Sequence, residues 1–168
     1  AESKVLGNLT QNVARCAADY LIETSPEDSV ITVSNGFAVN ATIEAMPRMN
    51  WLASRVIQAI GSVSNEEVQV DASETCRRLA GQLGGRHIAL PAPLVVSAPE
   101  VAYSLIQSQQ VAGILHYAAT ADTALVGIGT IEDRKKGYIF DGYVEEETSA
   151  ILQRDGAVGH ICGHHFNA

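Results

Sequence analysis

The feature that most constrains the fold is an alternation between short apolar runs and segments of helical periodicity. Short runs rich in β-branched or other apolar residues predict strands at residues 29–33, 55–60, 87–90 and 123–129. Around them, apolar residues recur at helical spacing and predict helices at residues 5–24, 38–46, 71–83 and 97–119. This rhythm predicts an α/β fold, a mostly parallel Rossmann-like sheet with helices on both faces.

Individual residues mark where these helices end. Pro26 stops the first helix, and the helix at residues 97–119 is expected to break near Ser108. Asp71 with Glu74 three residues later forms a capping box for the third helix, which Gly84 ends. Beyond the fourth strand, one more helix is predicted at residues 145–153, followed by an apolar run at residues 157–162.

Length and charge exclude several classes of function. The chain has 168 residues, enough for one domain over residues 1–168. Its net charge of −8 repels DNA phosphates, so this chain is not expected to contact DNA itself. No stretch approaches the roughly 20 apolar residues of a membrane span. Residues 1–4 do not form a secretion signal. A cytoplasmic location is expected from the three cysteines.

The three cysteines are widely spaced and odd in number. Cys16, Cys76 and Cys162 therefore argue against a disulfide framework and indicate a reducing compartment. Because Cys16 and Cys76 lie in helical patterns, we expect both to be small buried apolar side chains.

The first candidate ligand-binding segment follows the first predicted strand, and it consists of Asn35, Gly36, Phe37 and Ala38. A strand ends here, a glycine permits close backbone approach, and a helix begins. The exposed N–H groups of that helix start favour a bound phosphate. The alternative is a tight turn that binds no ligand.

A second glycine-rich segment consists of Gly127, Ile128, Gly129 and Thr130. It is not a dinucleotide fingerprint, because the third glycine and the downstream acidic residue are missing, and it has no P-loop lysine. Structural packing of the two glycines is the alternative to ligand binding.

Residues 159–165 hold three histidines and one cysteine, which are residue types that bind transition metals. Metal sites usually draw ligands from separated segments, and the sequence has no second cluster. We therefore predict neither a metal nor a cofactor.

No catalytic constellation can be assigned. There is no nucleophile elbow, and residues 145–147 are interpreted as an acidic cluster at a helix N-terminus rather than a catalytic pair. Asp122, Asp133 and Asp141 are candidates by position for a catalytic base, but none lies in a catalytic motif.

An ordered set of motifs points to a known family. The segments are Gly61 after a strand, Leu-Pro-Ala-Pro-Leu-Val-Val-Ser at residues 90–97, Ala-Leu-Val-Gly-Ile-Gly-Thr at residues 124–130, and Gly-Ala-Val-Gly-His-Ile-Cys-Gly at residues 156–163. Over roughly residues 13–168 this series resembles the sugar-binding effector domain of the SorC family of bacterial transcription regulators. The resemblance implies the fold of sugar-phosphate isomerases and deaminases, used for sensing.

The resemblance also implies partners. Family members bind phosphorylated sugars at loops after the strands, which places Gly61 and His160 among the site residues beside the two segments above. They contact DNA through an N-terminal helix-turn-helix domain and form dimers or tetramers, with no membrane association. The family continues well past residue 168, so the chain is expected to be a fragment that lacks the C-terminal part of the domain.

The chain departs from the family pattern at several positions. Where the family places a threonine, this chain has Phe37 and Ala38, which removes a hydroxyl near the phosphate. His160 and Asn167 replace residues that are usually acidic. If His160 faces the pocket, ligand affinity is expected to rise as the pH falls from about 8 to 6; the alternative is that His160 only caps a turn.

Three functions compete at this stage. The leading one is a ligand-sensing domain that controls operator binding in response to a phosphorylated sugar or related carbohydrate. The second is a sugar-phosphate isomerase or deaminase on the same fold, since fold alone does not decide function. The third is an assembly domain that has lost ligand binding, motivated by Phe37 and Ala38.

Overall fold

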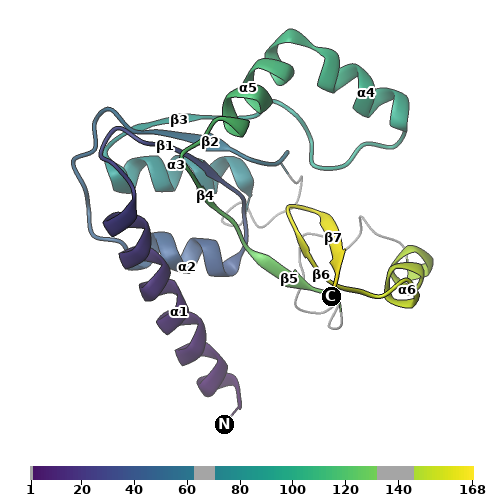
Figure 1. Ribbon diagram of the computed structural model, residues 1–168, viewed down its shortest axis with the longest axis horizontal. Helices are drawn as coiled ribbons and strands as arrows, with labels where there is room; N and C mark the ends of the chain where they lie inside the picture. The colour runs from purple at the N-terminus through teal and green to yellow at the C-terminus, as the bar shows by residue number, and fades with distance from the viewer. Residues whose placement is uncertain (1, 63–70, 132–145) are drawn as a thin grey trace. The chain divides into compact units, whose positions relative to one another are not determined.

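The computed structural model describes residues 2–62, 71–131 and 146–168, which belong to two compact units, Ala1–Leu125 and Val126–Ala168 (Figure 1). The first unit is built on a sheet of β1 (Val30–Val33), β2 (Arg55–Gln58), β3 (Arg86–Ile88) and β4 (Thr123–Leu125). The strand order is β3-β2-β1-β4, and all three pairings are parallel. The predicted parallel α/β sheet is confirmed for this unit.

Five helices accompany this sheet among the described residues: α1 (Glu2–Thr24), α2 (Phe37–Ala45), α3 (Ala72–Leu83), α4 (Pro99–Gln107) and α5 (Gln109–Ala119). α1, α2 and α3 lie on one side of the sheet, and α5 with α4 lies on the other (Figure 1). The expected break falls at Ser108, whose extended backbone separates α4 from α5.

The main core fills the space between the sheet and the first three helices. Alternate residues of β1, Ile31 and Val33, are fully buried on this side, as a sheet covered on its face requires. They pack with apolar side chains from β2 and from the inner faces of α1, α2 and α3. The cluster comprises Ala18, Leu21, Ile31, Val33, Val39, Ile43, Met46, Trp51, Val56, Cys76, Leu79, Ala80 and Leu83.

The ends of α3 follow the sequence signals. The Asp71 side chain accepts a hydrogen bond from the Ser73 N–H at 3.0 Å, which confirms it as the N-cap. Gly84 adopts a left-handed conformation with φ of 84° and ends the helix. Glu74 pairs with Arg77 one turn later.

The second unit contains β5 (Ile128–Thr130), α6 (Glu146–Arg154), β6 (Ala157–Ile161) and β7 (His164–Asn167). Its three strands form an antiparallel sheet in the order β5-β6-β7. Cys162 and Gly163 have positive φ angles of 51° and 84°, which suit the two-residue turn between β6 and β7.

One expectation about this region was wrong, and one of its strands was not predicted. The single strand predicted at residues 123–129 is divided, because β4 ends at Leu125 and pairs with β1 while β5 begins at Ile128 and pairs with β6. A glycine within such a run weakens strand continuity, and apolar alternation does not reveal which partner each half takes. Strand β7 was not predicted, because its two histidines belong to a cluster that suggests metal ligands and not a strand.

The cysteines divide by exposure. Cys76 is fully buried as expected, and its thiol donates to the Val56 carbonyl at 3.4 Å. The prediction for Cys16 was wrong: it is exposed, because it lies on a face of α1 other than the one carrying the core residues Ala18 and Leu21.

Burial makes a testable difference to the Cys76 thiol, whose pKa it raises to about 11. We expect dithiobis-nitrobenzoate at pH 8 to label Cys16 in the folded protein and Cys76 only after unfolding in urea. Since the unfolded thiol loses its proton near pH 8.5, the contribution of Cys76 to stability is full below that pH and declines toward pH 11. Cys76→Ala should remove this decline. Labelling of Cys76 as fast as Cys16 would contradict the prediction.

Candidate functional site

The candidate site lies where the direction of strand addition reverses. From β1 the chain adds β2 and then β3 on one side, and β4 later joins the other side of β1. The carboxyl ends of these parallel strands share one edge, where Val33 is in register with Gln58 and Leu125. Open α/β sheets bind ligands outside such a switch point. The segment that leaves β1 here contains the predicted residues Asn35, Gly36, Phe37 and Ala38.

Asn35 is the most unusual side chain of this loop. It is 3% exposed, and within the described part of the chain neither Nδ2 nor Oδ1 has a hydrogen-bond partner. Leaving a buried amide unsatisfied costs about 1–3 kcal/mol, so native proteins rarely do so without a reason.

Gln58, at the end of the neighbouring strand, shows how a buried amide in this unit is normally satisfied. Its Nε2 donates to the Ile60 carbonyl at 2.7 Å and to Ser62 Oγ at 3.2 Å, while its Oε1 accepts from the Leu90 N–H at 3.0 Å. Gln58 is therefore a structural amide. The unsatisfied donors and acceptor of Asn35 favour a partner supplied from outside the chain.

The space around Gly36 is open, so a ligand can come close to the backbone of this loop. Its φ of 128° and ψ of 160° are accessible to glycine, and a Cβ added there would meet no atom within 4 Å. Gly36 is also the N-cap of α2, and as a glycine it has no side chain with which to cap that helix. Phe37 and Ala38, which open the helix, are both exposed.

Gly61 is a glycine for a different reason. A Cβ there would lie 2.3 Å from the carbonyl carbon and oxygen of Pro93, so the backbone of the 90–94 segment occupies that space. Ser62 bridges to the same segment through hydrogen bonds with Ala92 and Leu94. Contact between backbone segments accounts for this glycine without a ligand.

The other predicted site residues belong to the second unit. Ile128, Gly129 and Thr130 form β5, and Gly127 precedes it. His160 lies within β6 opposite Gly129, so it is a strand residue rather than a turn cap. A Cβ on Gly129 would meet the His160 ring at 2.0 Å, which shows that the ring packs directly over this glycine.

The environment of His160 changes the expected effect of pH. The side chain is 7% exposed, and its ring centroid is 5.7 Å from that of His165. Burial, with a smaller contribution from His165, lowers the pKa of His160 below its usual range. Protonation of His160 is therefore shifted to lower pH than the sequence led us to expect.

We expect the stability of the Val126–Ala168 unit to fall as the pH drops below about 6.5. As the pH falls, His160 is protonated in the unfolded chain before it is protonated in the folded protein, because folding lowers its pKa. The stability of the folded unit therefore decreases from about pH 6.5 down to the lowered pKa of His160. Hydrogen exchange of β6 amides at pH 7.5 and 5.5 measures this loss, and His160→Gln should reduce it. If His160→Gln loses the same stability between pH 7.5 and 5.5, protonation of another group causes the loss.

Among the described residues, the structure supports neither the metal-ligand candidates nor Asp122 as parts of the candidate site. In the described ranges 2–62, 71–131 and 146–168, no three His, Cys, Asp or Glu side chains gather as a metal site would require. Asp122 Oδ2 accepts a hydrogen bond from the Val30 N–H at 2.8 Å, at the amino end of β1 and away from the switch-point edge. Asp133, Asp141 and Glu145 lie outside the described residues.

Sequence reasoning missed the polar residues that support the loop from α2 and α3. Asn40 lies among the buried residues of α2, and Arg78 of α3 donates to its Oδ1 at 2.9 Å. A polar residue inside the apolar segment 39–43 was the available signal, but its partner lies 38 residues away.

Many α/β domains with an open parallel sheet bind small molecules at the switch point, and the candidate site of this chain occupies that position. Residues 3–168 match the family described as "Putative sugar-binding domain", and the chain belongs to that family. The Deoxyribonucleoside regulator of Bacillus subtilis (strain 168) is 27% identical over 160 residues, covering 95% of this chain and 50% of the relative. LsrR, a transcriptional regulator of Enterobacter sp. (strain 638), is 41% identical over 80 residues, covering 47% of this chain and 25% of the relative.

Solved structures share the fold. The full-length sorbitol operon regulator SorC from Klebsiella pneumoniae has a TM-score of 0.85 at 23% identity, covering 94% of this chain and 51% of that one. A DeoR family transcriptional regulator from Listeria monocytogenes has a TM-score of 0.82 at 20% identity, covering 94% and 61%. The family match and the shared fold thus confirm the predicted resemblance to sugar-binding domains of the SorC type. The chain spans about half the length of the Bacillus and Klebsiella regulators.

Proposed function

We propose that this chain is the effector-sensing domain of a cytoplasmic transcription regulator and that it binds a phosphorylated sugar or related small carbohydrate. The observation that carries the proposal is the buried, unsatisfied amide of Asn35 at the switch point. A carbohydrate hydroxyl both donates and accepts hydrogen bonds, so it satisfies the two sides of an amide. The N-terminus of α2 beside it favours a phosphate group.

The regulator role follows from family membership together with the charge of the chain. A net charge of −8 does not suit contact with DNA phosphates, so we assign DNA binding to a helix-turn-helix domain of the same regulator. The described helices include none that is both long and apolar enough to cross a membrane. We further propose a homodimer or homotetramer as the working assembly.

We assign sensing rather than catalysis to the site. An isomerase or deaminase needs a base within hydrogen-bond reach of the bound sugar. Asp122, the one candidate that the structure describes, holds a backbone N–H at the opposite end of β1. Pentose and hexose phosphates incubated with the protein should remain unchanged in their NMR spectra. Turnover on the order of 1 per second or faster would establish the enzyme instead.

Calorimetric titration with pentose and hexose phosphates, and with the corresponding free sugars, tests binding directly. We expect at least one compound to bind and Asn35→Ala to weaken its affinity about tenfold or more, since two or more hydrogen bonds to the amide are lost. Asn50→Ala is the matched control, because Asn50 lies in the loop before β2 at the opposite edge of the sheet. If no compound releases heat, an assembly role without a ligand takes precedence.

A further inference from the structure

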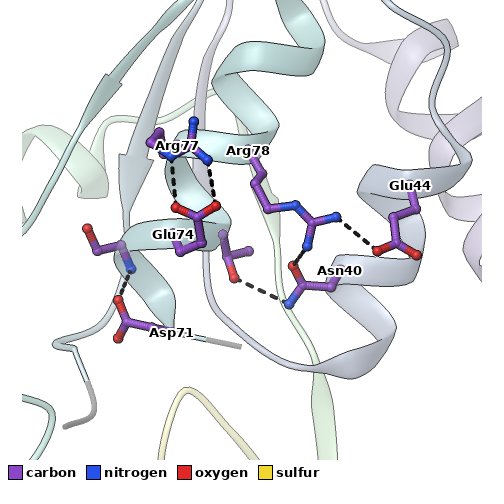
Figure 2. A network of polar contacts seen from close by, with 8 residues as sticks. Asn40, Glu44, Asp71, Glu74, Arg77 and Arg78 are labelled. Carbon is purple, nitrogen blue, oxygen red and sulfur yellow. Dashed lines mark hydrogen bonds and ion pairs between the residues drawn. The ribbon is translucent and has the colours of Figure 1, made fainter. Parts of the chain in front are cut away.

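A polar network joins α2 and α3 (Figure 2), and one of its members, Asn40, also contacts the backbone of the candidate loop. Asn40 is 7% exposed, and its Nδ2 donates to the Gly36 carbonyl at 3.1 Å and to Thr75 Oγ1 at 3.3 Å. The backbone N–H of Asn40 donates to the same Gly36 carbonyl at 2.9 Å. Two donors from one residue therefore fix the orientation of the peptide that follows Gly36.

Arg78 fixes Asn40 in turn. One terminal nitrogen of its guanidinium donates to Asn40 Oδ1 at 2.9 Å, and the other donates to a carboxylate oxygen of Glu44 at 2.9 Å (Figure 2). The planar guanidinium directs these two donors along fixed, diverging lines, which the single ammonium of lysine does not reproduce. With Oδ1 held by Arg78, Nδ2 of Asn40 necessarily faces Gly36 and Thr75.

The two hydrogen bonds from Asn40 stabilise the backbone at the start of α2. The N-cap residue of α2 is a glycine, which has no side chain to cap the helix, and its conformation costs most other residues energy. Unsupported, a glycine at such a position samples several backbone states. The hydrogen bonds from Asn40 select one of them.

We propose that Arg78 is a positioning residue for the effector site. Through Asn40 it fixes the peptide after Gly36, and so it presets the loop of Asn35 to Ala38 without touching the effector. The proposal rests on the proposed function in assigning that loop to ligand binding. A preset loop loses less conformational freedom when a ligand binds, and affinity rises accordingly.

A neighbouring arginine provides the matched control. Arg77 lies beside Arg78 on α3 and pairs with Glu74 at 2.6 Å within the same helix, and its side chain is 61% exposed. Arg77→Gln removes the same charge and breaks an ion pair, which in this case is a two-bond pair within a single helix. It leaves the hydrogen bonds of Asn40 with Gly36, Thr75 and Arg78 intact.

Hydrogen exchange of the ligand-free protein tests the positioning itself. We expect Arg78→Gln and Arg78→Lys to speed exchange of the Asn40 amide, which donates to the Gly36 carbonyl, about tenfold, with little change in the amides of β1 and β2. Asn40→Asp should do the same, because it keeps the acceptor for Arg78 but loses both side-chain donors. Arg77→Gln should exchange like wild type. Equal effects of the Arg77 and Arg78 variants, or none, would overturn the proposal.

Affinity provides the second readout, with glucose 6-phosphate and ribose 5-phosphate as probes. For a probe that binds wild type, we expect Arg78→Gln to weaken binding about fivefold to tenfold and Arg77→Gln to leave it unchanged. If neither probe binds wild type, the assignment of these ligands fails while hydrogen exchange still decides the role of Arg78. If a probe binds and both variants match wild type, the function stands and the positioning role is wrong.

Discussion

Gly61→Ala is expected to destabilise the first unit by about 3 kcal/mol. The added Cβ would lie 2.3 Å from the carbonyl atoms of Pro93 and 2.5 Å from the Leu94 nitrogen. These are backbone atoms, so the chain itself must move. The move strains the hydrogen bonds from the Ser62 N–H to Ala92 and from the Leu94 N–H to Ser62, at 2.9 and 2.8 Å.

Urea denaturation followed by circular dichroism measures this loss. Gly81→Ala is the control, because Gly81 lies inside α3 and a Cβ there would meet nothing within 4 Å. That variant should be more stable than wild type by about 0.5–1 kcal/mol, as alanine is the better helix former. If Gly61→Ala and Gly81→Ala unfold at the same urea concentration, the close packing against Pro93 is incorrect.

Gly36→Val is expected to abolish ligand-induced thermal stabilisation while leaving the sheet folded. Valine tolerates a φ of 128° poorly, so the substitution costs about 1–3 kcal/mol or forces the loop into another conformation. Because the space around Gly36 is open, no clash within the protein accompanies this strain. The damage is therefore confined to the start of α2 and to the approach of the ligand.

Thermal melts with and without a sugar phosphate that binds wild type measure the effect. The melting temperature of wild type should rise with ligand by mass action, whereas that of Gly36→Val should not respond. Gly113→Ala, in the interior of α5 with open space around it, should retain the full response. A full response in Gly36→Val would place the ligand elsewhere.

The sequence was sufficient for the elements whose signals are local. The β-branched run at residues 30–33 predicted the central strand, Asp71 and Gly84 predicted the ends of α3, and Ser108 marked the break between two helices. Each signal depends on neighbours within a turn or a strand, and periodicity captures such neighbours well.

Features that depend on distant partners were not predictable in the same way. The run at residues 123–129 is split between two sheets because its halves pair with β1 and β6, far apart in sequence. The role of Gly61 depends on Pro93, and that of Asn40 depends on Arg78. Cys16 is exposed because helical periodicity does not tell which apolar stripe of α1 meets the core.

For the candidate site, the sequence predicted the loop, and the structure shows the position and the unsatisfied amide of Asn35. The strand–glycine–helix order predicted that Asn35 and Gly36 follow β1. Only the fold places them at a switch point and leaves the Asn35 amide buried without a partner among the described residues. Both glycine segments were predicted to contribute site residues, and the His160 ring packed over Gly129 supplies a structural reason for that glycine.

The central claim is that a carbohydrate ligand satisfies the Asn35 amide, and its side-chain NH2 resonances in a ¹⁵N–¹H spectrum report on this directly. They are identified by their loss in Asn35→Ala. On titration with a sugar phosphate that binds, we expect these two resonances and the backbone amides of residues 36–38 to shift together, saturating at the calorimetric stoichiometry. Binding that leaves the Asn35 side-chain resonances in place, with shifts confined to other parts of the chain, would contradict the account.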